Sequence, residues 1–116
     1  MLFYNEEDVV DLNNHEGAYY MPNALFNTMQ YKLVRLEVKW AYVACLNALL
    51  DHPLYDDKGN AFILDDDASV AEILKELAHK KVDQAKVDGY IEELENYELI
   101  ERKGREVYLK KIVNIF

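Results

Sequence analysis

Residues 96–111 read NYELIERKGREVYLKK, and this stretch decides how the rest of the sequence is interpreted. An apolar pair, Leu99 and Ile100, leads into the basic turn Arg102-Lys103-Gly104-Arg105, and Val107 to Leu109 lead out of it. Apolar runs on both sides of a turn that contains glycine predict a tight β-hairpin. The tip of this hairpin is cationic, although the chain as a whole carries a formal net charge of -9.

Two amphipathic helices are predicted before the hairpin. Helix 83–97 has an apolar stripe at helical spacing, formed by Val87, Tyr90, Ile91, Leu94 and Tyr97. Helix 68–78 has a similar stripe, formed by Val70, Ile73, Leu74 and Leu77. Ser69 and Glu72 fit a capping box at its start, and a short turn at 79–82 separates the two helices.

A third helix is predicted at 36–51, where the sequence is apolar on nearly every side, and Pro53 follows it. The turn residues at 57–60 then precede a short strand at 61–64. The order is helix, strand, helix, turn, helix, hairpin. We therefore predict an α+β, mostly helical fold, a winged helix-turn-helix with a small antiparallel sheet.

The chain of 116 residues suits one folded domain, and 51% of its residues are hydrophobic. We expect an acidic, loosely held N-terminal arm at 1–18 and the winged-helix domain at 19–116. Within that domain, residues 19–27 are expected to form a short strand that enters a single helical turn at Pro22. No apolar run reaches the length of about 18 residues that suggests a membrane span, so we expect a cytoplasmic protein without membrane contact.

Charge is distributed unevenly along the chain. Residues 1–74 contain 13 acidic and 4 basic residues, whereas residues 75–116 contain 9 of each. The mean field of such a chain does not attract nucleic acid. Any contact with DNA must therefore come from local basic groups in the last third.

In a winged helix the last helix faces the major groove and the hairpin lies along phosphates. Gln84 and Lys86 are then candidates for base or phosphate contact near the start of helix 83–97. The turn before this helix and the hairpin tip supply the remaining candidates for phosphate contact, which are His79, Lys80, Lys81, Arg102, Lys103 and Arg105.

Four groups of residues resemble the N-terminal domain of the replication initiator A proteins of Gram-positive plasmids and phages. An opening motif consists of Tyr20, Pro22, Leu25 and Phe26, and a Leu-Leu pair, Leu49 and Leu50, ends the long helix. A turn and strand motif follows with Asp56, Gly59, Phe62 and Ile63. The closing motif is Leu94-Glu95-Asn96-Tyr97-Glu98-Leu99-Ile100-Glu101-Arg102-Lys103.

The resemblance implies a winged-helix domain that binds repeated origin sites in double-stranded DNA, often as a dimer. Independently, helix 36–50 has more apolar surface than the other two helices of such a domain can cover, so the rest needs either the 1–30 segment or a second subunit. We therefore predict a homodimer whose interface includes Trp40, Tyr42, Val43 and Leu46.

A second hypothesis remains open because the exposed positions of helix 83–97 include the acidic residues Asp83, Asp88, Glu92 and Glu93. The winged helix would then dock a protein partner through its acidic surface. In a third, it is a phage or plasmid inhibitor that occupies the nucleic-acid-binding site of a host protein.

The sequence favours a binding protein over an enzyme. It contains no nucleophile elbow and no phosphate-binding loop. The single Cys45 excludes an internal disulfide and is predicted to be a buried apolar residue, and the three His residues, His15, His52 and His79, are scattered. Asp65, Asp66 and Asp67 are expected to cap a helix and not to bind a metal. We expect neither a metal nor a cofactor.

Overall fold

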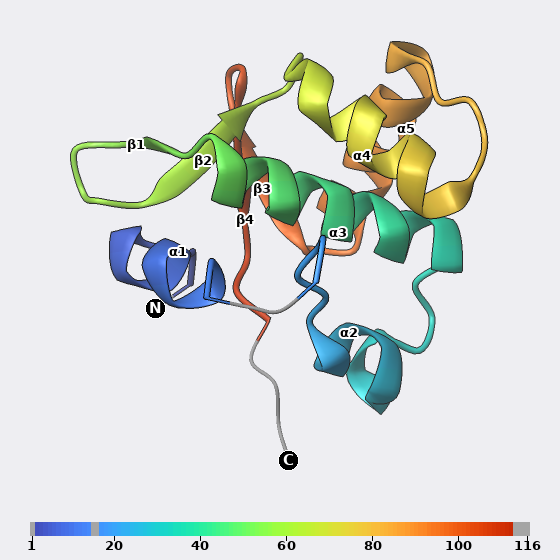
Figure 1. The fold of residues 1–116 in the computed structure, drawn as a ribbon, viewed down its shortest axis with the longest axis horizontal. Helices are drawn as coiled ribbons and strands as arrows, with labels where there is room; N and C mark the ends of the chain where they lie inside the picture. Colours follow the sequence, from blue (N-terminus) through green and yellow to red (C-terminus); the bar gives the residue numbers. More distant parts are fainter. Residues whose placement is uncertain (1, 15–16, 113–116) are drawn as a thin grey trace.

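The computed structural model of the protein describes residues 2–14 and 17–112, and the fold is the predicted α+β winged helix-turn-helix (Figure 1). The helices, in chain order, are α1 (Glu6–Leu12), α2 (Asn23–Asn27), the 3-10 turn η1 (Met29–Tyr31), α3 (Leu36–Asp51), α4 (Ala68–Ala78) and α5 (Gln84–Asn96). The strands are β1 (Leu54–Tyr55), β2 (Ala61–Leu64), β3 (Ile100–Lys103) and β4 (Glu106–Leu109).

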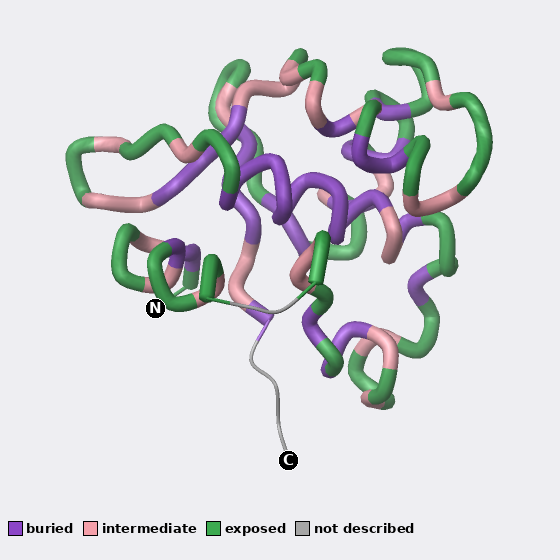
Figure 2. Tube along the Cα trace, viewed as in Figure 1, coloured by how far each residue is buried: buried purple, intermediate pink, exposed green. Residues whose placement is uncertain are grey.

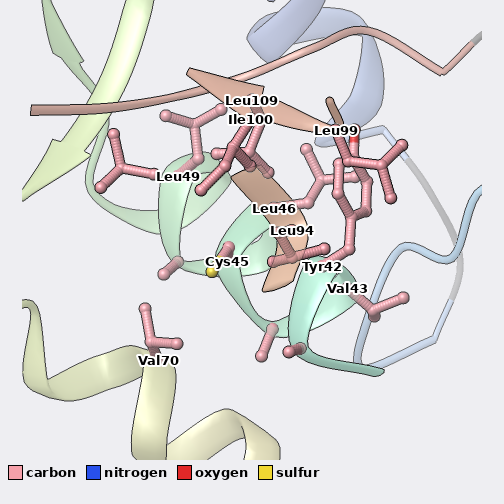
Figure 3. Close-up of a cluster of buried hydrophobic side chains, with 14 of the residues drawn as sticks. Tyr42, Val43, Cys45, Leu46, Leu49, Val70, Leu94, Leu99, Ile100 and Leu109 are labelled. Atoms are coloured by element: carbon pink, nitrogen blue, oxygen red, sulfur yellow. The ribbon is translucent and has the colours of Figure 1, made fainter. Parts of the chain in front are cut away.

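Helix α3 runs through the centre of the molecule, and α4, α5 and the sheet pack around it (Figures 1 and 2). The close-up in Figure 3 shows Leu46 and Leu49 of α3 beside Leu94 of α5 and Leu109 of β4. All four side chains are 0% exposed. A helix that is apolar on nearly every side needs such complete cover, and the sequence predicted its bounds correctly.

The chain itself covers the side of α3 that was expected to be left over. Tyr42, Val43 and Leu46 are 0% exposed. Trp40 is half-buried, and its ring centroid lies 5.2 Å from that of Phe26 in α2. Exposed apolar surface on α3 is therefore confined to its first turns, where Leu36 is 60% exposed, and Tyr42, Val43 and Leu46 do not support a dimer interface.

A buried amide explains how the segment before α2 is fixed to α3. The Asn47 side chain accepts a hydrogen bond from the Tyr20 backbone N–H and donates one to the Tyr20 carbonyl, both at 2.9 Å. Asn47 is 4% exposed, and these bonds supply the partners that a buried amide requires. Residues 19–21 form no strand, contrary to the prediction, whereas α2 is the predicted single turn.

The described part of the N-terminal arm is packed onto the domain, and the prediction of a loosely held arm is wrong for residues 2–14. Asn5 caps α1 in a capping box with Asp8. Bridges join Phe3 to Lys110 and Asn5 to Asn60. Tyr4 and Val9 are 2% and 4% exposed and belong to the main core. The arm therefore closes the face of the domain near the last strand.

The sheet is antiparallel, in the order β1-β2-β4-β3. Strand β2 pairs Ile63 with Val107, so it supplies the third partner that stabilises the hairpin. We call the hairpin from Ile100 to Leu109 the wing. Its two-residue turn is Gly104-Arg105, where Gly104 has φ 60°, a conformation that glycine adopts without steric cost.

Aspartate side chains cap the N-terminal ends of both helices of the helix-turn-helix. Asp67 accepts a hydrogen bond from the Ser69 N–H, and Asp83 accepts one from the Lys86 N–H. The predicted capping box of Ser69 and Glu72 is wrong, since Asp67, two residues earlier, is the cap of the helix. Tyr97 is also 41% exposed and not part of the buried stripe, because α5 ends at Asn96.

Candidate nucleic-acid interface

Basic side chains gather where α4 meets α5. Helix α4 ends at His79, whose left-handed conformation (φ 54°) turns the chain sharply. Lys80 and Lys81 follow and are exposed. A surface hollow of about 490 Å³ is lined by Glu72, Lys75, Glu76, His79, Lys80 and Lys81. The turn thus places three lysines around one concave surface.

Lys86 extends this surface onto the first turn of α5. A second hollow, of about 360 Å³, is lined by Glu72, Lys75, Lys81, Val82, Asp83 and Lys86. Since Lys75 and Lys81 line both hollows, the lysines form one continuous basic surface. We call Lys75, Lys80, Lys81 and Lys86 the turn cluster.

The turn cluster differs from the other basic groups in its partners. No carboxylate of the described residues lies within 4.0 Å of any of its four ammonium groups. Lys80 and Lys86 instead act at longer range on Glu37, whose pKa is lowered first by a hydrogen bond from Tyr90 and then by the nearby positive charges. The lysines are thus available to an anionic ligand. Sequence reasoning missed Lys75, although its place in the last turn of α4, just before Lys80 and Lys81, was a usable signal.

Gln84 lies at the wing side of the start of α5. Its side-chain amide donates a hydrogen bond to Asp88 Oδ1 at 2.8 Å and one to the Asp65 carbonyl at 3.3 Å. These bonds fix the side chain along the outer face of α5. The two candidates for base or phosphate contact, Gln84 and Lys86, therefore both lie in the exposed first turn of the helix.

The space between α5 and the wing is acidic. A hollow of about 480 Å³ there is lined by Asp65, Ala85, Asp88, Gly89, Ile91, Glu92 and Arg102. Three carboxylates thus face a single guanidinium. Phosphate is repelled by such a surface, so this hollow separates the turn cluster from the cations of the wing.

The wing cations already have partners within the protein. Arg102 donates to Glu95 Oε1 from Nη2 at 2.8 Å and from Nε at 3.1 Å, and this interaction lowers the pKa of the Glu95 carboxyl. Arg105 forms an ion pair with Asp66 and lies 3.6 Å, from Nε to Oδ1, from Asp65. The Lys103 ammonium lies over the Tyr108 ring, 5.0 Å from its centroid.

A further ion pair that the sequence did not suggest neutralises part of the acidic surface of α5. Arg35 contacts both oxygens of Glu93, with Nη2 at 2.6 Å and Nε at 3.1 Å. Its Nη1 lies 3.6 Å from Glu37, which accepts a hydrogen bond from the Tyr90 hydroxyl at 3.1 Å. Glu93 is therefore not a free acid, contrary to what the sequence pattern indicated.

Acidic and sulfur groups have structural roles in the described residues. Asp67 caps α4 as predicted, and Asp65 and Asp66 face Arg105. Burial raises the pKa of the Cys45 thiol to about 12.

Over residues 2–14 and 17–112, no three His, Cys, Asp or Glu side chains are grouped as metal ligands would be. His15 lies outside the described residues. None of the described helices has the length and apolarity that crossing a membrane requires.

Comparison with known proteins identifies the fold. The sequence matches no protein-family model and no curated protein. A solved structure of an MDR initiator has 23% sequence identity and a TM-score of 0.59, covering 96% of this chain and 87% of that one. An N-terminal domain of a DNA-binding protein has 21% identity and a TM-score of 0.55, with coverage of 92% and 83%. A Rep-DNA complex has 24% identity and a TM-score of 0.55, with coverage of 90% and 82%.

These likenesses confirm the resemblance to replication initiators at the level of the fold. They cover between 90% and 96% of this chain, and therefore extend beyond the helix-turn-helix.

Proposed function

We propose that this chain binds double-stranded DNA and serves as the DNA-binding domain of a replication initiator. The observation that carries the proposal is the turn cluster: four lysines without ion-pair partners among the described residues, placed beside the start of α5. In a helix-turn-helix this is the edge that approaches the duplex. The shared fold supports the same function, because one of the similar structures is a Rep-DNA complex and another an initiator.

The proposed contact uses two kinds of residue. The lysines of the turn cluster, together with His79, contact phosphates and set the orientation of the domain. Gln84, at the start of α5, is the side chain that reaches base edges in the major groove, and Lys86 beside it belongs to the phosphate contacts. Farther along α5, Asp88 and Glu92 line the acidic hollow, so base contact is confined to the first turns of the helix.

The remaining features of the proposal follow from the resemblance in sequence. The binding sites are repeated origin sequences of a plasmid or phage, the protein acts in the cytoplasm, and it binds without catalysing a reaction. Pairing of two copies is part of the proposal. Since most of α3 is covered, we assign the pairing to a groove of about 500 Å³ where the apolar residues Leu2, Met29, Leu33 and Tyr97 lie beside Glu98, Lys110 and Lys111.

The experiment that tests DNA binding is a titration with duplex DNA at several salt concentrations. If the four lysines each neutralise one phosphate, the logarithm of the binding constant falls against the logarithm of the salt concentration with a slope of roughly -3.6. A chain that binds no duplex even at low salt is not a DNA-binding domain.

A second candidate function is docking of a protein partner through the acidic surface. The observation that favours it is the hollow between α5 and the wing, where Asp65, Asp88 and Glu92 face the single guanidinium of Arg102. An inhibitor of a host nucleic-acid-binding protein would present a similar surface. In both cases charge reversal at Asp65 or Glu92 abolishes partner binding, and changes in the turn cluster have no effect.

A further inference from the structure

Two ion pairs connect the wing to the elements beside it. Glu95, in the last turn of α5, accepts two hydrogen bonds from the guanidinium of Arg102 in β3. Asp66, in the loop before α4, pairs with Arg105 of the wing turn. The side chains of these four residues are between 35% and 62% exposed, so each pair lies at the surface where a ligand can reach it.

The backbone holds the second pair in place. The Asp65 N–H donates to the Arg105 carbonyl at 2.9 Å, and the Asp65 carbonyl accepts from the Gln84 side chain. The loop at 65–67 is therefore fixed between the wing turn and the start of α5. Asp66 faces Arg105 because of the fold, and not because two flexible side chains happen to meet.

We propose that Glu95 and Asp66 lower the affinity of the wing for DNA, because they hold its two arginines in ion pairs that a phosphate has to open. The inference rests on the proposed DNA-binding function and deepens it. Arg102 and Arg105 are held in ion pairs within the protein, and Glu95 and Asp66 determine how much the two arginines contribute to the affinity for DNA.

The physical reason is competition between two anions for one guanidinium. Exposed ion pairs contribute little to stability, so a phosphate is able to displace the carboxylate. The displaced carboxylate nevertheless stays near the phosphate and repels it. Each arginine therefore gains little when it exchanges its internal partner for DNA, and the unpaired lysines of the turn cluster supply most of the affinity.

The test replaces each carboxylate by its neutral isostere, Glu95→Gln and Asp66→Asn. Neither residue caps a helix, since Asp67 and Asp83 have that role, so both variants are expected to fold. Loss of a negative charge near the end of α5 even favours the helix dipole. The matched control is Asp57→Asn, which changes the net charge equally but lies in the exposed β1–β2 turn, away from α5 and from the tip of the wing (Figure 1).

Each variant is titrated with the same duplex DNA at two salt concentrations. A released arginine gains one phosphate contact, so we expect about fivefold tighter binding at low salt and a salt slope steeper by about 0.9. Asp57→Asn is expected to change both quantities much less. Adding Arg102→Ala to Glu95→Gln is expected to remove the gain.

The outcomes separate this inference from the proposed function. If the parent protein binds DNA and the two variants bind no more tightly than Asp57→Asn, the inference is wrong and DNA binding stands. If neither the parent nor any variant binds duplex DNA, both fail. If the parent binds too weakly to measure and the two variants bind, the restraint is confirmed in its strongest form.

Discussion

The hydroxyl groups of Tyr4 and Tyr42 lie 2.9 Å apart in the core, and this hydrogen bond joins the N-terminal segment to the central helix α3. The Tyr42 hydroxyl also donates to the Lys110 carbonyl at 2.8 Å, and the Ile112 N–H donates to the Tyr4 hydroxyl at 3.2 Å. The bonds form one chain in which each hydroxyl donates once. It ties together the first residues, α3 and the segment after β4.

This chain of hydrogen bonds makes Tyr42→Phe a test of the packing of the N-terminal segment. The change leaves the half-buried Lys110 carbonyl without its donor and the buried Tyr4 hydroxyl without its acceptor, so we expect a loss of about 1–3 kcal/mol in the free energy of unfolding. Urea denaturation measures it. Tyr55→Phe, at an exposed tyrosine of β1, is the control and is expected to be nearly neutral. Equal stability of the two variants would show that the buried bonds are not formed.

A second prediction concerns Cys45 and alkaline pH. Because burial raises the pKa of its thiol from 9.0 to about 12, the native protein is expected not to react with a thiol reagent at pH 8. The unfolded chain releases the thiol proton from about pH 9.0, whereas the folded chain retains it. Stability is therefore expected to fall as the pH rises from 9.0 towards 12, and the raised pKa values of Tyr4 and Tyr42 act in the same direction. Rapid labelling of the native thiol would contradict this account of the core.

Pairing of two copies is predicted to use the groove beside η1. Leu33 is 85% exposed and Met29 is 77% exposed, and both line that groove. We expect Leu33→Glu to shift the protein to monomers in sedimentation experiments without loss of stability, because the side chain is not buried in one copy. Val10→Glu, at an apolar residue of α1 that is 60% exposed and outside the groove, is the control. A parent protein that is monomeric at high micromolar concentration would refute the pairing.

The sequence predicted the helices and the wing because their patterns are local. Helix 36–51 was correct to the residue, and helices 68–78 and 83–97 were correct to within one residue at each end. Apolar spacing of 3.6 residues and the glycine turn at Gly104 report directly on backbone structure. The sequence offered both Ser69 and the run Asp65–Asp67 as caps of helix 68–78, and the structure selects Asp67.

The electrostatic character of the site could not be predicted in the same way. Arg105 pairs with Asp66 and Arg35 with Glu93, over separations of 39 and 58 residues. No periodic pattern reports such pairs. The basic hairpin consequently looked like the main phosphate contact in the sequence, whereas the structure shows its arginines in internal ion pairs. For the same reason the sequence could not decide between the 1–30 segment and a second subunit as the cover of α3, which Tyr4 and Tyr20 supply by bonding to Tyr42 and Asn47.

The central claim is that the turn cluster binds duplex DNA, and the most direct measurement is the affinity of lysine variants at two salt concentrations. We expect Lys81→Ala and Lys86→Ala each to weaken binding several-fold and to flatten the salt slope by about 0.9, since each removes one phosphate contact. Lys58→Ala, an equal change of charge in the exposed β1–β2 turn, is expected to leave both quantities nearly unchanged. Absence of binding by the parent at low salt, or an equal loss in Lys58→Ala, would contradict the claim.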